Sequence, residues 1–274
     1  MPADEDRRPR SVRFEQHTLH ELRSASEREA VVLIPIGAIE QHGPHLPVET
    51  DTLLATRVCE GAATRLDDVL VAPPVPWGLS NAHVGLGGTL SLRPTTMFAL
   101  SIDIIESLIR SGFTRQIWVN GHASNDPALA MVVYEAKRLF GISIGALSYF
   151  SLGDDTFERL RKTPVGGTLH ACEYETSLML HVASGIADTD VAHYIEPLTE
   201  FDIADGSQPG VARIGYTFAE RFPEGVAGDP RSASEATGRE VFDACVAGLA
   251  EFVTAFRNVD LVNQPVEPDP VPRW

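Results

Sequence analysis

The sequence contains few cysteines, few basic residues and no long apolar run. Its three cysteines, among 274 residues, lie far apart and form no Cys-x-x-Cys pair, which excludes a disulfide framework and a zinc-finger spacing. Lysine and arginine total 22 against 38 aspartates and glutamates, so the formal net charge is −16. Because phosphates require a basic face, we expect no nucleic-acid partner. No apolar stretch is long enough to cross a bilayer, so we expect no membrane partner.

Motifs of two other chemistries are also missing. The sequence has no Gly-x-Ser-x-Gly, the motif that forms the nucleophile elbow of α/β-hydrolases. The glycine-rich stretch Gly85–Gly88 is not Gly-x-Gly-x-x-Gly, and no phosphate-binding lysine motif follows it.

The two ends of the chain differ in composition from the part between them. The first dozen residues are polar and mixed in charge, without the apolar core of a secretory signal. We therefore predict a disordered tail over residues 1–15 and a cytoplasmic protein. The proline-rich end predicts a second irregular tail over residues 259–274. Hydrophobic residues make up 43% of the chain, so residues 16–258 are predicted to form a single domain with its own core.

Apolar runs and helical patterns alternate along this domain. Continuous β-branched runs predict buried strands over Val31–Ile36, Gln116–Val119 and Ile142–Leu147. Apolar residues at three- and four-residue spacing predict helices over Thr52–Leu66, Thr95–Ser111, Pro127–Phe140 and Glu173–Ala183, and from Ser232 or Ser234 onward. Alternating strands and helices predict an α/β fold with a mostly parallel sheet.

The segment that follows the first strand, GAIEQHGPHLPVETD, is dense in possible metal ligands. Glu40 and His42 are two residues apart, so in extended backbone they point to the same side. Asp51 begins the next helix and could return to the same place, where its two oxygens could bridge two cations. As an alternative, Asp51 or Thr50 only caps that helix. His45 could be a surface residue or could support a ligand.

The segment NGHASN follows the second strand, so His122 should emerge at the same edge of the sheet as Glu40. Gly121 should permit a tight turn, and Asn125 should cap the next helix. The alternative is that this is an ordinary loop sequence.

A third group, His170, Glu173 and Glu175, lies at the start of a predicted helix in HACEYETS. Acidic residues there are also favoured by the helix dipole, so either glutamate could be purely structural. The two glutamates lie on different faces of the helix, so at most one should bind a metal.

Cys172 could act as a nucleophile, but a metal site makes that unnecessary. His83 could line the pocket, with an ordinary loop histidine as the alternative.

These motifs together resemble the creatininase (creatinine amidohydrolase) family. The resemblance is carried by GAIEQHGPHLPVETD, WGLSNAHVGLGGTLSL, NGHASN, HACEYETS and, more loosely, GVAGDPRSASEATG, in that order. It implies a three-layer α/β/α fold and two divalent metal ions per chain, with zinc favoured over manganese or iron. It also implies a homo-oligomer, from a dimer up to a hexamer.

The resemblance also implies roles for individual residues. One metal would be bound by Glu40, Asp51 and His122, and the other by His42, Asp51 and a second carboxylate. In creatininase proper this carboxylate lies two residues after the histidine of NGH, where this chain has Ser124. Relatives with another form of this loop use the glutamate of ETS instead, which is Glu175 here. His170 would protonate the leaving nitrogen. Apart from the resemblance, Glu173 lies one turn from His170 and could orient that histidine or contact substrate.

The reaction that follows is hydrolysis of a non-peptide C–N bond, of cyclic amide or formamide type, by a metal-bound hydroxide. One alternative keeps the site but cleaves a short peptide, as in peptidases of the mycofactocin precursor. Another is a non-catalytic metal- or ligand-binding α/β protein. The expected partner is accordingly a small-molecule amide or a short peptide. No tryptophan lies between Phe150 and Glu175, where creatininase has its substrate gate, which argues against creatinine itself.

Overall fold

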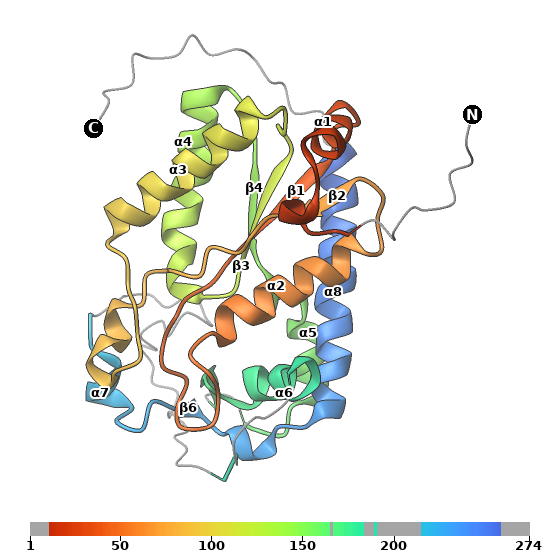
Figure 1. Ribbon diagram of the computed structural model, residues 1–274. Coiled ribbons are helices and arrows are strands. Elements are labelled where there is room, and N and C mark those ends of the chain that lie inside the picture. Colours follow the sequence, from red (N-terminus) through yellow and green to blue (C-terminus); the bar gives the residue numbers. More distant parts are fainter. Residues whose placement is uncertain (1–10, 165–166, 184–188, 191–214, 259–274) are drawn as a thin grey trace.

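The computed structural model describes residues 11–164, 167–183, 189–190 and 215–258, and its elements form three layers (Figure 1). The middle layer is a four-stranded parallel sheet in the order β2-β1-β3-β4. Its strands in that order are Val69–Val71, Val31–Ile36, Gln116–Asn120 and Gly145–Ser148. The predicted three-layer α/β/α fold is confirmed.

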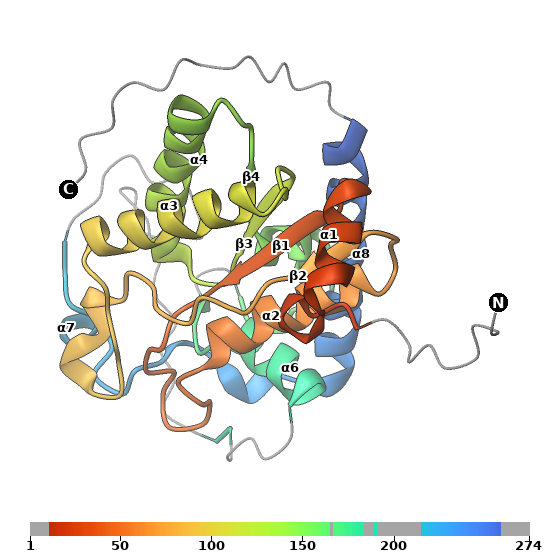
Figure 2. The same ribbon diagram turned by 45° about the horizontal axis from the view of Figure 1, so that its top comes forward.

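Helices cover both faces of the sheet (Figure 2). Successive β1 residues point to opposite layers, so Val31 and Leu33 lie in one core and Val32, Ile34 and Ile36 in the other. The first core lies under α2 (Thr50–Ala63), α6 (Glu173–Val182) and α8 (Glu235–Asn258). The second lies under α1 (Leu19–Glu27), α3 (Pro94–Arg110) and α4 (Asp126–Phe140). Within the described residues, none of these helices has both the length and the apolar content to cross a membrane.

A smaller unit lies beyond the carboxyl ends of the strands. There β5 (Thr168–His170) pairs antiparallel with β6 (Ala227–Gly228), next to α7 (Phe218–Arg221). The helix α5 (Asp154–Leu160) leads toward β5. His170 therefore reaches the sheet edge from a second sheet rather than from the central one.

The elements of the structure differ from the predicted ones in several places. The last strand begins at Gly145 and not at Ile142. Residues 11–15, placed in the N-terminal tail, join the fold: Arg13 bridges to Val71, and the Phe14 ring packs 5.3 Å from that of Phe113. Elements α1 and β2 were not predicted, since three residues are too few for β2 to show a period. Residues 1–10 and the predicted tail 259–274 lie outside the described residues.

Two glycines let the first turn of α2 lie against the sheet edge. A Cβ at Gly37 would lie 2.5 Å from the backbone nitrogen of Thr52, and one at Gly121 would overlap the backbone oxygen of Asp51. Gly121 does not have a positive φ, so a left-handed backbone is not the reason for a glycine here. It permits a close backbone approach, and this approach brings Asp51 to the ends of β1 and β3.

Candidate metal centre

Acidic and imidazole groups converge beyond the carboxyl ends of β1 and β3, the usual place for a ligand in a parallel α/β sheet. Three groups of side chains have ligand atoms that all lie within 4.8 Å of one another. The groups are Glu40, Asp51 and His122; His42, Asp51 and Glu175; and Glu40, His42 and His170. Asp51 belongs to the first two groups, as a residue that bridges two cations would.

The side chain of Asp51 faces this cluster. Its Oδ1 lies 3.1 Å from Nε2 of His42, and its Oδ2 lies 3.2 Å from Nδ1 of His122. Helix α2 begins at Thr50 with Glu49 as its N-cap, and no side-chain hydrogen bond caps it. The geometry therefore favours the ligand interpretation of Asp51 over the capping interpretation.

Backbone carbonyls set which nitrogen of each ligand histidine faces the cluster. Nδ1 of His42 donates to the carbonyl oxygen of Glu40 at 3.0 Å, and Nε2 of His122 donates to that of Leu79 at 3.2 Å. A carbonyl oxygen only accepts, so these nitrogens carry protons. Nε2 of His42 and Nδ1 of His122 are left to bind a cation, with the outer hydrogen bond that metal-binding histidines commonly make.

The spacing of the ligand atoms fits a divalent cation. In a tetrahedral site with ligands about 2.0–2.1 Å from the ion, neighbouring ligand atoms are about 3.3 Å apart. Nδ1 of His122 lies 3.4 Å from Oε1 of Glu40. Nε2 of His42 lies 3.7 Å from Oε1 of Glu175. Oε2 of Glu40 is buried and has no hydrogen-bond partner among the described residues. Such an oxygen is costly to bury unless a cation or another donor reaches it.

The charges of the cluster are strongly coupled. Burial raises the pKa of Glu40 to about 7. Burial by itself would lower the pKa of His122, but the charges of Glu40 and Asp51 outweigh it and raise that pKa to about 9. Burial opposes ionisation of Asp51 as well, yet His42 and His122 hold its pKa below the usual range. Protons on the histidines thus balance the negative charge of the carboxylates, as bound cations would do in their place.

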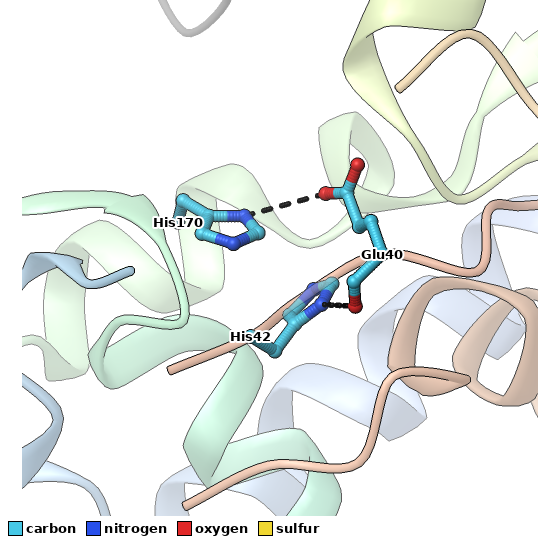
Figure 3. A group of neighbouring side chains, drawn as sticks. All are labelled: Glu40, His42 and His170. Carbon is cyan, nitrogen blue, oxygen red and sulfur yellow. Dashed lines mark hydrogen bonds and ion pairs between the residues drawn. The ribbon is translucent and has the colours of Figure 1, made fainter. Parts of the chain in front are cut away.

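His170, from β5, faces the carboxylate of Glu40 (Figure 3). Its Nε2 donates to the backbone oxygen of Gln41 at 2.7 Å, and its Nδ1 lies 3.5 Å from Oε1 of Glu40. Burial and the nearby His42 hold the pKa of His170 well below its usual range. The structure therefore presents a neutral imidazole with an unprotonated Nδ1 at the cluster.

The two glutamates of α6 point to different places, as expected for different faces of a helix. Oε2 of Glu175 accepts from the backbone N–H of Ala171 at 2.5 Å, while its Oε1 faces His42. Glu173 is fully buried, and its carboxylate accepts from the backbone N–H groups of Lys162 and Thr163, at 3.0 and 2.8 Å, and from the Thr163 hydroxyl. The structure brings Glu175 into the cluster and leaves Glu173 outside it.

Several supporting residues were missed or misassigned in the sequence. Asn125 is the N-cap residue of α4, as predicted, but its side chain makes no capping hydrogen bond. Its amide instead donates to the Gly37 carbonyl at 3.0 Å, and its Oδ1 accepts from the N–H of Leu79 at 2.9 Å. It thereby joins the ends of β1 and β3 to the 77–92 segment. The Ser80 hydroxyl lies 3.3 Å from Nε2 of His122. The only sign of Ser80 in the sequence was its place in that segment.

His45 and Cys172 are buried beside the cluster rather than in it. Nε2 of His45 lies 3.0 Å from the hydroxyl of Thr176, which links the loop after β1 to α6. Burial lowers the pKa of His45 to about 4, so it is neutral. Burial raises the pKa of the Cys172 thiol to about 12, so a thiolate nucleophile is not available there.

Comparison with known proteins agrees with this geometry. A sequence model of the family described as creatinine amidohydrolase matches residues 15–253. The mycofactocin precursor peptide peptidase of Mycobacterium ulcerans is 33% identical over 235 residues, covering 81% of this chain and 85% of that protein. The creatinine amidohydrolase of Pseudomonas putida is 29% identical over 244 residues, covering 82% and 89%.

Solved structures show the same likeness. A crystal structure of creatinine amidohydrolase matches with a TM-score of 0.76 at 26% identity, and the match covers 90% of this chain and 98% of that chain. Solved creatininases include a Zn–Zn type and a Mn form. The matched residues include every segment that carries the cluster.

Proposed function

The chain belongs to the creatininase (creatinine amidohydrolase) family, and on that premise we propose that it hydrolyses a non-peptide C–N bond of cyclic amide or formamide type. One observation carries the proposal. The nitrogens of His42 and His122 that a cation could bind in place of a proton face three carboxylates at the separations expected of ligands around divalent cations.

We assign two divalent ions to each chain, with zinc favoured over manganese or iron. The first would be held by Glu40, Asp51 and His122, and the second by His42, Asp51 and Glu175. The Zn–Zn and Mn forms of solved creatininases support the choice of metals. When bound, the two ions would lower the pKa of a water molecule and polarise the carbonyl oxygen of the substrate.

The protein groups around the ions would orient the substrate and move protons. His170 can accept or release a proton only at Nδ1, because its Nε2 is bonded to the carbonyl of Gln41. Nδ1 faces the cluster, so His170 would accept the proton that the attacking water loses and pass it to the leaving nitrogen, which is otherwise a poor leaving group. Glu173 would act through the segment it anchors, at Lys162 and Thr163, rather than by contact with the reacting atoms.

A second candidate keeps the site and changes the substrate. The peptidases of the mycofactocin precursor are 31–33% identical to this chain, against 29% for the creatinine amidohydrolase. This similarity favours a short peptide as the alternative substrate. A non-catalytic metal- or ligand-binding protein is the third candidate, and only a lack of turnover would favour it.

Metal analysis and a substrate panel test the proposal. Protein purified without chelator should contain about two divalent ions per chain and should hydrolyse a cyclic amide or a formamide in a panel that also includes creatinine and short peptides. Chelated protein, reloaded with zinc or manganese, is the control. Turnover of peptides alone would favour the second candidate, and metal without any turnover the third. Activity in fully metal-free protein would exclude the mechanism.

Compartment and assembly are also proposed. We propose that the enzyme works in the cytoplasm as a homo-oligomer, from a dimer up to a hexamer, on the basis of its composition and its family. Light scattering that finds a monomer at working concentration would contradict the assembly.

A further inference from the structure

We propose that His83 is a catalytic residue whose Nε2–H donates a hydrogen bond to the carbonyl oxygen of the substrate, and that Gln41 is the positioning residue that holds His83 in this tautomer. The inference rests on the proposed function, because it concerns the same site. It assigns a role to a histidine that lies beside the cluster but belongs to none of its three ligand groups.

A backbone donor indicates the orientation of the Gln41 amide. The N–H of Gly43 can only donate, and it lies 3.0 Å from Oε1 of Gln41. The other end of the amide is therefore the NH₂ group, which only donates. It lies 3.1 Å from Nδ1 of His83 and also 3.1 Å from Nε2 of His170, which donates to the backbone oxygen of Gln41 at the shorter distance of 2.7 Å. Nδ1 of His83 must accept from the NH₂ group, so the proton of the neutral ring is on Nε2.

This arrangement is the reverse of that at the other three histidines. Nitrogens of His42, His122 and His170 donate to backbone carbonyls, so the nitrogen toward the cluster is the one that can give up its proton and bind a cation or exchange a proton. His83 instead directs an N–H toward it. A protonated nitrogen cannot bind a cation, so His83 is a hydrogen-bond donor and not a further metal ligand.

The N–H of His83 has no acceptor among the described residues. The carboxylate atom nearest to it is Oε2 of Glu40, at 3.9 Å, which is too far for a hydrogen bond. His83 is only 6% exposed, so an incoming oxygen that accepts from this N–H would make a hydrogen bond in a largely buried place. A substrate carbonyl, and still more the negative oxygen that develops from it, is such an acceptor.

The ring of His83 is held rigidly at this place. It stacks on Phe218 of α7, with centroids 4.2 Å apart and planes 21° apart. Its backbone N–H donates to the carbonyl of Ser80 at 2.9 Å. A donor fixed in advance stabilises a developing charge without the cost of reorganisation.

His83 and His170 lie on the two sides of one carboxylate. Nδ1 of His170 lies 3.5 Å from Oε1 of Glu40, and Nε2 of His83 lies 3.9 Å from Oε2, with ring centroids 4.6 Å apart. A C–N bond bound here would present its oxygen to His83 and its nitrogen to His170. The pair would thus set the direction in which the substrate binds.

The tautomer can be measured without turnover. In protein with ¹⁵N-labelled histidine, long-range ¹H–¹⁵N spectra should show His83 protonated at Nε2, with its signals assigned by their loss in His83→Gln. Gln41→Glu keeps the shape but replaces the donor with an acceptor, so it should move the proton to Nδ1. A proton on Nδ1 in the unaltered protein would overturn the inference.

The role is tested with a matched pair of variants. His83→Asn keeps an acceptor for Gln41 but loses the donor at Nε2, whereas His83→Gln restores an amide donor near that position. In the zinc-loaded full chain, His83→Asn should weaken the binding of acetohydroxamate, measured by calorimetry, about ten- to hundredfold. For any amide that the enzyme hydrolyses, the variant should lower kcat by a similar factor. Zinc content should not change, and His83→Gln should recover part of the loss.

The outcomes separate this inference from the proposed function. If the unaltered protein binds zinc and acetohydroxamate and His83→Asn binds both equally well, the inference is wrong and the metal site stands. Loss of zinc in His83→Asn would also overturn it, since His83 would then support the metal. An unaltered protein that binds no zinc would overturn the proposed function, and the inference with it.

Discussion

Four histidines surround Glu40, and their outer hydrogen bonds differ. Three of them donate to backbone carbonyls, so the nitrogen that faces the cluster is the one that can bind a cation or exchange a proton. His83 accepts from the side chain of Gln41 and offers a proton. Residues of one type can therefore hold metal, transfer protons or donate hydrogen bonds, depending on a partner on the far side of the ring.

Asp51 is expected to be indispensable to both ions. Asp51→Ala should abolish metal binding and activity, because one oxygen faces His42 and the other faces His122. Elemental analysis and activity assays measure the two effects. Thr50→Ala is the control: it removes a hydroxyl that bonds the carbonyl of Pro47 at the same turn, and it should keep the metal. If Asp51 served only as a cap, its loss would cost about 1 kcal/mol with metal retained.

Glu175 and Glu173 provide a second test at the scale of residues. Glu175→Gln should lower metal content toward one ion per chain, because its Oε1 faces His42. Glu173→Gln should keep both ions but reduce the free energy of unfolding by about 1–3 kcal/mol, because an amide NH₂ would meet the donors of Lys162 and Thr163. Metal stoichiometry and denaturant unfolding of the two variants, side by side, check this.

Beside Glu40, His42, Asp51 and His122, the proposed site needs a fifth ligand. If Glu173→Gln loses metal and Glu175→Gln keeps two ions, that ligand is Glu173. If both variants keep two ions, the fifth ligand lies elsewhere, and the family assignment fails at this position.

At the scale of elements, the site depends on how closely α2 approaches the sheet. The first turn of α2 lies against Gly37 and Gly121, at the ends of two parallel strands. Neither contact leaves space for a side chain, and both involve backbone atoms that cannot rotate away. The packing of a helix end on a sheet edge therefore sets the position of Asp51.

Gly121→Ala should displace the start of α2. The added methyl group would overlap the backbone oxygen of Asp51, so we expect lower metal content and a loss of about 1–3 kcal/mol in the free energy of unfolding. Gly85→Ala is a matched control, because its Cβ would lie 3.8 Å from the Ala219 side chain, an ordinary contact. Unchanged metal content and stability in Gly121→Ala would show that α2 can shift without cost.

At the scale of the whole molecule, the cluster joins distant parts of the chain. Its residues come from the loop after β1, the start of α2, the end of β3, β5 and α6. Cations held among them would link the central sheet to the layer of α2, α6 and α8. Since the unfolded chain cannot hold these ligands together, metal binding should contribute directly to the stability of the fold.

Removal of metal should therefore lower Tm. With zinc at about 1,000 times its Kd, binding adds about 4 kcal/mol. At about 2–4 °C per kcal/mol for a domain of this size class, the difference between zinc-loaded and chelated protein should be on the order of 10 °C. Scanning calorimetry measures it. Asp51→Ala should show no zinc-dependent shift, and an equal Tm with and without zinc in the unaltered chain would contradict a site that spans the layers.

The sequence by itself determined the first strand, the types of metal-binding residue and the family. The run VVLIPI predicted Val31–Ile36, and β1 has those bounds, because a buried parallel strand is apolar throughout. The motif at Glu40, His42 and Asp51 lies within 12 residues, so local spacing was enough to indicate it. The short β2 and the start of β4 were not predictable in this way, since their pairing partners rather than their own pattern define them.

Only the tertiary structure decided which groups meet and where their protons lie. Glu175 belongs to the cluster because its Oε1 faces His42, whereas the carboxylate of Glu173 is hydrogen-bonded to Lys162 and Thr163. The tautomer of His83 depends on Gln41, which lies 42 residues earlier in the chain. Such contacts form when separate segments fold onto one sheet edge, and no local pattern in the sequence records the atom that a side chain will face there.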